Sequence, residues 1–215
     1  TGELTREEIE EGTQPHNLMD DKQGVVWYAG NRNGTIGRYD PRTKQFQHYR
    51  MPDSTVRDPH TLVFDREGHI FFTAQGSQAF GHLNTYTGEV RLVKVAPSSN
   101  PYGIVVDAQN RAWANLFRTN KLAMIDPVTL KVTEFATPRA EARTRRIGLT
   151  SDGAVWYVDY AAGRLARFDP KTKQFKEWMT PGGEGSRPYA VVVGDPDRIW
   201  LFESAARDVN QLGGV

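Results

Sequence analysis

Short apolar segments separated by turn-forming residues run along the whole chain and recur with a period of about 43 residues. The period is marked by one large aromatic residue in each unit, at Trp27, Phe71, Trp113, Trp156 and Trp200. A polar turn such as DREG precedes each aromatic, and a brief apolar run such as GIVV precedes the turn. Apolar runs of this length, bounded by turns and without helical spacing, predict short buried β-strands.

The second half of each unit predicts a β-hairpin. Residues 33–46 (NGTIGRYDPRTKQF) and 162–175 (AGRLARFDPKTKQF) repeat almost the same phrase, and both contain an Asp-Pro step. Asp at the first and Pro at the second position favour a tight turn between two strands. Each unit therefore reads as four strands, which is typical of one blade of a β-propeller.

The repeat register predicts one domain over residues 1–215, built from five blades. The units span 14–52, 58–97, 100–138, 143–181 and 186–215. TGEL at the start of the chain matches TGEV at 87–90, which opens an outermost strand. We therefore expect residues 1–10 to pair with the blade containing Trp200 and to close the ring, which removes two exposed edges. The alternative is an arc from a larger ring.

Composition narrows the range of partners. The chain has 27 basic and 26 acidic residues and no cysteine. A formal charge of +1 does not indicate the excess of basic residues expected of a nucleic-acid-binding protein. The apolar runs are too short to span a bilayer, and the chain carries no cationic, apolar leader of the signal-peptide type. A small-molecule ligand is the expected partner, and neither the compartment nor the oligomeric state follows from the sequence.

The blade geometry predicts which polar residues share one face. In a propeller, the connections into the innermost strands and the loops after the second strands emerge at the same end of the axis. The residues expected there are His16, Asp58, His60, Tyr102, Arg146, Asp159, Arg187, Tyr189 and Glu203. The run TPRAEARTRR at 137–146 adds a basic rim suited to a carboxylate or phosphate, or else forms a solvated loop.

The units resemble those of the streptogramin B lyase (virginiamycin B lyase) family over essentially the whole chain. The resemblance rests on Pro-His before the innermost strand, on Gly-x-(Val/Ile)-Trp, and on G-x-I-x-R-(Y/F)-D-P. It implies elimination at the ester of a cyclic depsipeptide, assisted by Mg²⁺, with histidines and carboxylates at blade starts. His16 fits one family position, and Asp58 with His60 fits the next, whereas a third, occupied by Glu in the family, falls on Ala74. The family has seven blades, more than this chain encodes.

We expect Asp58 and Glu203 to share a divalent ion, and His16 or His60 to be the catalytic residue that moves a proton. The shared ion requires that closure of the ring brings the fifth blade beside the first. Tyr102, Arg146, Asp159, Arg187 and Tyr189 are the expected substrate-binding residues. The histidines and carboxylates also have interpretations in which they take no part in catalysis or metal binding. The histidines would line a water-filled channel, Asp58 would cap a turn, and Glu203 and Asp159 would be solvated. The predicted function is a metal-assisted lyase acting on a cyclic ester. The alternatives are a propeller that binds a small ligand or a protein partner without catalysis, and a sugar-lactone hydrolase. The hydrolase needs a fuller set of metal-ligating carboxylates and Asn than the repeat register places at this face.

Overall fold

The computed structural model describes residues 2, 4–205 and 211–214, and all of its regular secondary structure is β-strand. The strands form five antiparallel sheets, four with four strands and one with three. The predicted all-β propeller architecture is confirmed. No helix in these ranges could serve as a membrane span.

Each sheet is a blade whose strands follow one another in chain order. Blade one contains β1 (Pro15–Asp20), β2 (Val26–Gly30), β3 (Thr35–Asp40) and β4 (Gln45–Arg50). Blade two contains β5 (Pro59–Phe64), β6 (Ile70–Ala74), β7 (Ala79–Leu83) and β8 (Val90–Lys94). Blade three contains β9 (Pro101–Val106), β10 (Ala112–Leu116), β11 (Lys121–Ile125) and β12 (Val132–Ala136). Blade four contains β13 (Ile147–Leu149), β14 (Val155–Asp159), β15 (Arg164–Asp169) and β16 (Gln174–Met179). Blade five contains β17 (Pro188–Gly194), β18 (Arg198–Glu203) and β19 (Gln211–Gly214).

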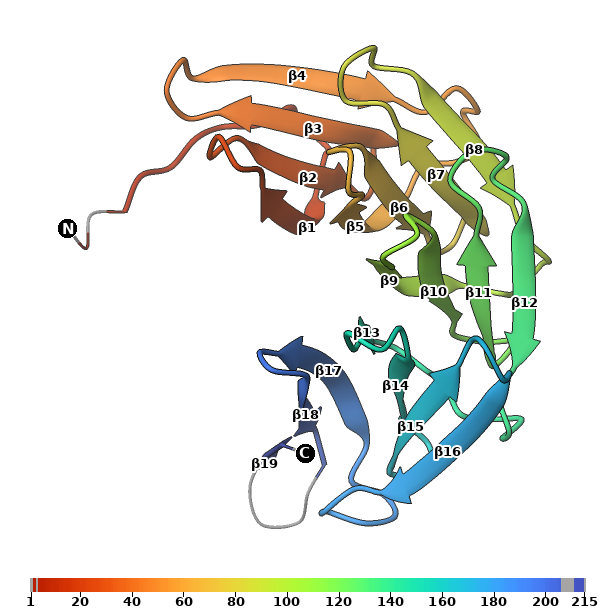
Figure 1. Cartoon of the computed structure of the whole chain (residues 1–215). Coiled ribbons are helices and arrows are strands. Elements are labelled where there is room, and N and C mark those ends of the chain that lie inside the picture. The colour runs from red at the N-terminus through yellow and green to blue at the C-terminus, as the bar shows by residue number, and fades with distance from the viewer. Residues whose placement is uncertain (1, 3, 206–210, 215) are drawn as a thin grey trace.

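The blades stand side by side in an open arc, with β1, β5, β9, β13 and β17 innermost and β4, β8, β12 and β16 on the outer rim (Figure 1). Neighbouring innermost strands contact one another from β1 through to β17. We call the end of the axis at which β1, β5, β9 and β17 begin the mouth. The starts of these four innermost strands therefore lie at the same end of the axis.

The repeated aromatic residue fills the space between one blade and the next. Trp113 of blade three packs with Ile147, Tyr157 and Phe168 of blade four, and it is 1% exposed. Trp27 likewise joins a buried cluster with residues of blade two. Phe71 is fully buried as well, whereas Trp156 and Trp200 are partly buried. The core position that the spacing predicts is therefore confirmed for three of the five aromatic residues.

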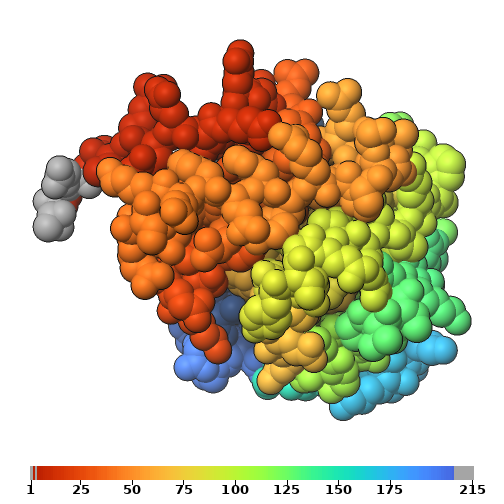
Figure 2. Space-filling model, turned by 90° about the horizontal axis from the view of Figure 1, so that it is seen from above, coloured from red at the N-terminus to blue at the C-terminus, as the bar shows by residue number. Residues whose placement is uncertain are grey.

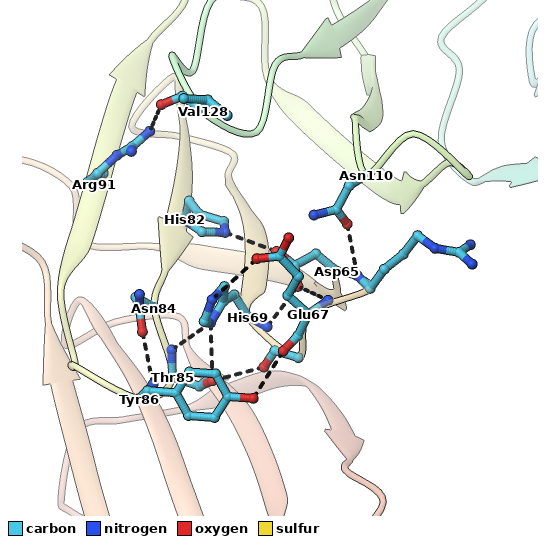
Figure 3. A network of polar contacts seen from close by, with 12 residues as sticks. Asp65, Glu67, His69, His82, Asn84, Thr85, Tyr86, Arg91, Asn110 and Val128 are labelled. Carbon is cyan, nitrogen blue, oxygen red and sulfur yellow. Dashed lines mark hydrogen bonds and ion pairs between the residues drawn. The ribbon is translucent and has the colours of Figure 1, made fainter.

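A hydrogen bond ties this aromatic to the turn before it, and blade two makes the bond differently. The indole Nε1 of Trp27 donates to Asp21 at 3.1 Å, and the indole Nε1 of Trp113 donates to Asp107 at 2.9 Å. In blade two the aromatic is Phe71, which has no N–H. Instead His82 bonds to Asp65 through Nε2 at 3.2 Å (Figure 3). The His82 ring contacts Phe71, with ring centroids 4.5 Å apart and the planes tilted by 52°. His82 therefore takes over the role of the missing indole.

Replacing His82 by leucine should lower the free energy of unfolding by about 1–3 kcal/mol, because the buried Asp65 carboxylate loses a charge-assisted bond. Burial alone would raise the pKa of Asp65, but bonds from His82 and from the His69 and Glu67 amides lower it. Arg38 is the matched control. It occupies the same ladder position in blade one, where the Trp27 indole already serves Asp21. Equal urea-unfolding losses for His82→Leu and Arg38→Leu would contradict this assignment.

The predicted closure of the ring by the N-terminal strand is wrong. Residues 4–10 form no strand, and the sheet of blade five contains only β17, β18 and β19 in the described part of the chain. The N-terminal segment lies against blade one (Figure 2). There Glu10 pairs with Arg50 at 2.7 Å and Glu7 with Lys44 at 3.7 Å. These glutamates are drawn to the basic side chains of β4 and of the turn before it. Thr1 and Val215, whose junction the closure requires, lie outside the described residues.

Candidate functional site

In four of the five blades, a proline and a β-bulge together place one side chain at the mouth. Proline opens β1, β5, β9 and β17, each time opposite the last residue of the neighbouring strand. Proline suits the first position of a strand because it has no N–H to donate to the ladder. A shift of register follows within the next residues of each of these strands. Bulges re-aim side chains, which accounts for the positions of His16, His60, Tyr102 and Tyr189.

His16 and His60 form a stacked pair at the mouth. Their ring centroids lie 3.8 Å apart with an angle of 30° between the planes. His16 is exposed, whereas His60 is 4% exposed. The Nδ1–H of His16 donates to the backbone carbonyl of His60 at 3.1 Å. A carbonyl only accepts, so the proton of a neutral His16 lies on Nδ1 and its exposed Nε2 carries a free lone pair.

His60 is held neutral by its surroundings. Burial is the main cause, and the nearby His16 and Arg146 add to it; together they lower the pKa of His60 to about 3. Its Nδ1 lies 2.9 Å from the Thr61 hydroxyl. The inner ring of the pair is therefore an uncharged, hydrogen-bonded platform at neutral pH.

The aromatic contacts continue from His60 across the mouth to blade five. The rings of His60 and Tyr102 lie 4.6 Å apart, and the Tyr102 hydroxyl meets the Tyr189 hydroxyl at 2.6 Å. Burial, followed by the bond to Tyr189, raises the pKa of Tyr102. Four residues expected at the mouth, from four different segments of the chain, thus form one continuous surface.

Arginine side chains lie over these aromatic rings. The Arg146 guanidinium carbon is 5.6 Å from the centre of the Tyr102 ring. The neighbouring Arg145 lies within cation–π range of four rings, those of Tyr102, Phe117, Tyr160 and Tyr189. Arg187 is exposed, and its backbone carbonyl accepts bonds from Ser204. The structure therefore joins Arg146 to the histidine pair through Tyr102.

The expected metal ligands are occupied in holding loops. Asp58 accepts bonds from the Ser77 amide at 3.0 Å and from the Ser77 hydroxyl and the Gly76 amide. Glu203 is fully buried, and both its oxygens lie 3.1 Å from the Gly182 amide. Within the ranges that the structure describes, no three His, Asp or Glu side chains converge at metal-binding distance. With blades one and five not joined through the N-terminal strand, Asp58 and Glu203 do not fit a shared divalent ion.

Asp159 and Ala74 complete the set of residues singled out by the sequence. Asp159 is fully buried, accepts bonds from the amides of Ala161 and Ala162, and lies 3.3 Å from the Nε of Arg139. Burial is the main cause of its raised pKa. Ala74 is fully buried opposite Pro59 and offers no ligand atom. Asp159 is thus a loop cap with an arginine partner, and the solvated carboxylate considered from the sequence is not found.

Sequence reasoning passed over Phe117 and Tyr160 and chose Arg146 ahead of Arg145. Phe117 and Tyr160 directly follow the second strand of their blades, where blades one and two carry Asn31 and Gln75. An aromatic residue at a loop position that is polar in blades one and two could have identified Phe117 and Tyr160 from the sequence. The choice between two adjacent arginines needs the side-chain directions that only the structure supplies.

Comparisons with known proteins agree with this fold. Residues 1–214 match the model of the Virginiamycin B lyase family. A search of curated proteins found no match. A solved streptogramin B lyase is 22% identical, with a TM-score of 0.81, and 94% of this chain covers 69% of it. A catalytically inactive virginiamycin B lyase from Staphylococcus aureus with quinupristin is 19% identical, with a TM-score of 0.84 and coverage of 95% and 70%.

A more distant likeness is to a chain of a protein complex. A chain of a nidogen/laminin complex is 16% identical, with a TM-score of 0.69, and 89% of this chain covers 73% of it. At these identities the solved structures show the fold alone. The match of the family model over nearly the whole length carries the assignment, and the chain belongs to the virginiamycin B lyase family.

Proposed function

We propose that the mouth binds a cyclic ester or depsipeptide and that His16 removes a proton from it, opening the ring by elimination. The observation that carries this proposal is the bond from His16 Nδ1–H to the His60 carbonyl, which leaves Nε2 as an exposed proton acceptor. Membership of the lyase family supports the reaction class. A positioned imidazole is the commonest general base in enzymes.

The surroundings of His16 suit proton removal. His60 stacks against it but stays neutral, so it places no positive charge beside the ring that accepts the proton. The bond to a backbone carbonyl fixes the orientation of the ring. Such an orienting partner is a recurrent feature of catalytic histidines.

The opposite side of the mouth can stabilise negative charge. His16 would remove the proton from the carbon next to the ester's alkyl C–O carbon, and charge builds on the oxygen of the carbonyl attached to the deprotonated carbon. The new carbon–carbon double bond forms as the alkyl C–O bond breaks and the acyl part of the ester leaves as a carboxylate. Fixed donors near the charged carbonyl oxygen lower the barrier. Arg146 lies over Tyr102, which in turn contacts His60. Arg146 and the Tyr102 hydroxyl are therefore the donors we assign to this oxygen. Among the residues that the structure describes, no group of three His, Asp or Glu side chains could hold a metal ion, and no step is assigned to an ion.

Quinupristin, which accompanies the inactive lyase relative, provides the test. Elimination should give a linear product with the mass of the substrate and a new carbon–carbon double bond. A product heavier by one water would indicate ester hydrolysis and contradict the elimination. Mass spectrometry of the reaction mixture, with ultraviolet absorbance for the double bond, separates these outcomes.

A non-catalytic binding propeller is the second candidate. It is favoured by Asp58 and Glu203, which hold loops, and by Ala74, which stands where the family pattern has a carboxylate. Under this alternative, quinupristin or another small ligand binds at the mouth and is recovered unchanged. Calorimetric binding together with an unaltered mass spectrum would establish it.

A further inference from the structure

Arg145 is held in an aromatic cage at the mouth. Its guanidinium carbon lies 4.5 Å from the ring centre of Tyr160, 4.8 Å from Phe117, 5.0 Å from Tyr189 and 5.8 Å from Tyr102. The rings come from blades three, four and five. The Arg145 backbone is fixed as well, because its carbonyl accepts a bond from the Gly103 amide at 3.0 Å. We call this group of five residues the arginine cage.

The cage leaves the charge of Arg145 without a counterion. Within the described residues, no carboxylate forms an ion pair with Arg145, Arg146 or Arg187. Asp159, the carboxylate at the end of β14, pairs with Arg139 instead. The Nε of Arg145 is buried and donates to no acceptor in the described part of the chain. A buried donor without a partner is rare in folded proteins and calls for an explanation.

A cavity shares one residue, Phe117, with the cage. Its volume is about 610 Å³, and Phe117, whose ring contacts Arg145, forms part of its wall. Two further arginines, Arg118 and Arg143, line it, with Glu141 as the acidic residue in the lining. The cavity that shares Phe117 with the cage therefore has two basic side chains and one acidic side chain in its lining.

We infer that the ligand of the mouth carries a carboxylate group, which Arg145 binds within the arginine cage. This inference rests on the proposed function and adds to its substrates cyclic esters that carry a carboxylate beside an apolar or aromatic body. Guanidinium groups bind carboxylates through two parallel hydrogen bonds and stack on aromatic faces at the same time. The rings cover the faces of the Arg145 guanidinium, and one of its N–H groups contributes a hydrogen bond that tends to lower the pKa of Tyr102. The unpartnered Nε–H is the donor that we assign to the anion. The neighbouring Tyr and Phe rings offer contact to the body of the ligand.

The probes for this inference are benzoate and benzamide, which have the same shape and differ in charge. Each is titrated into the intact chain while the Nε–H resonance of Arg145 is followed by NMR. We expect benzoate to shift this resonance saturably and benzamide to bind at least about tenfold more weakly, because benzamide cannot supply the charge-assisted bonds. Neither benzoate nor benzamide contains an ester or the C–H proton that His16 would remove, so neither can undergo the proposed elimination. Failure of the elimination therefore leaves this result unaffected.

Arg145→Met should weaken benzoate binding about tenfold or more. Arg198→Met is the matched control, since Arg198 also lies over an aromatic ring, that of Trp200, but at the opposite end of blade five. Equal binding of benzoate and benzamide to the wild type, or no saturable shift with benzoate, would overturn the inference without reference to any variant. Tighter binding of inorganic phosphate than of benzoate would overturn the choice of a carboxylate.

Discussion

Replacing His16 by alanine should slow the opening of a cyclic ester by about 10²–10⁴-fold, the usual contribution of a general base. The reason is that the exposed Nε2 of His16, left unprotonated by the bond from Nδ1 to the His60 carbonyl, is lost. Quinupristin affinity should change far less, because Tyr102, Tyr189 and the arginines remain. The measurements are the initial rate of ring opening, and the dissociation constant obtained by calorimetry.

His48→Gln is the matched control for His16→Ala. His48 lies on the outer strand β4 and bonds to the Tyr28 hydroxyl, away from the mouth. Its rate should equal that of the wild type. A His16→Ala variant that keeps the wild-type rate would remove His16 from the mechanism.

Acidification should destabilise the folded chain through His60. The pKa of His60 is lowered from 6.5 to about 3 in the folded state, so between these values the unfolded chain binds more protons. The contribution of neutral His60 to stability is therefore full above about pH 6.5 and is lost as the pH falls towards 3. Between pH 7 and pH 4 the loss should be roughly 3 kcal/mol in the free energy of unfolding.

His60→Gln isolates this effect, since glutamine does not titrate and the other ionisable groups stay the same. Urea unfolding at a series of pH values should give a shallower acid limb for His60→Gln than for the wild type. Parallel curves for the two proteins would show that His60 is not held neutral in the folded state. That result would also restore a positive charge beside His16 and weaken its assignment as the base.

The strands and the blade core were predictable because they depend on short-range pattern. The aromatic spacing that begins at Trp27 reflects packing between consecutive blades, and each Asp-Pro turn marks a hairpin. The closure was not predictable in this way. The TGEL match indicates a sequence that can form an outermost strand. It carries no information on the attraction of Glu7 and Glu10 to Lys44 and Arg50, which competes with pairing to blade five.

The site was predictable by position more than by chemical role. The repeat register located the side chains after each proline, and the stacked His16 and His60 follow from it. The roles of Asp58 and Glu203 depend on where amide groups of neighbouring loops point. Those amides, at Gly76, Ser77 and Gly182, take up the carboxylates that the sequence suggested for a metal. Loop conformation of this kind is not encoded in a blade repeat.

The position of the proton on His16 is the most direct test of the account, since the assignment of His16 as a proton acceptor rests on it. Long-range proton–nitrogen NMR correlation of the wild-type chain, at a pH where His16 is neutral, distinguishes the two ring nitrogens. The bond to the His60 carbonyl predicts a protonated Nδ1 and an unprotonated Nε2. A protonated Nε2 with an unprotonated Nδ1 would contradict that bond and the role of His16 derived from it.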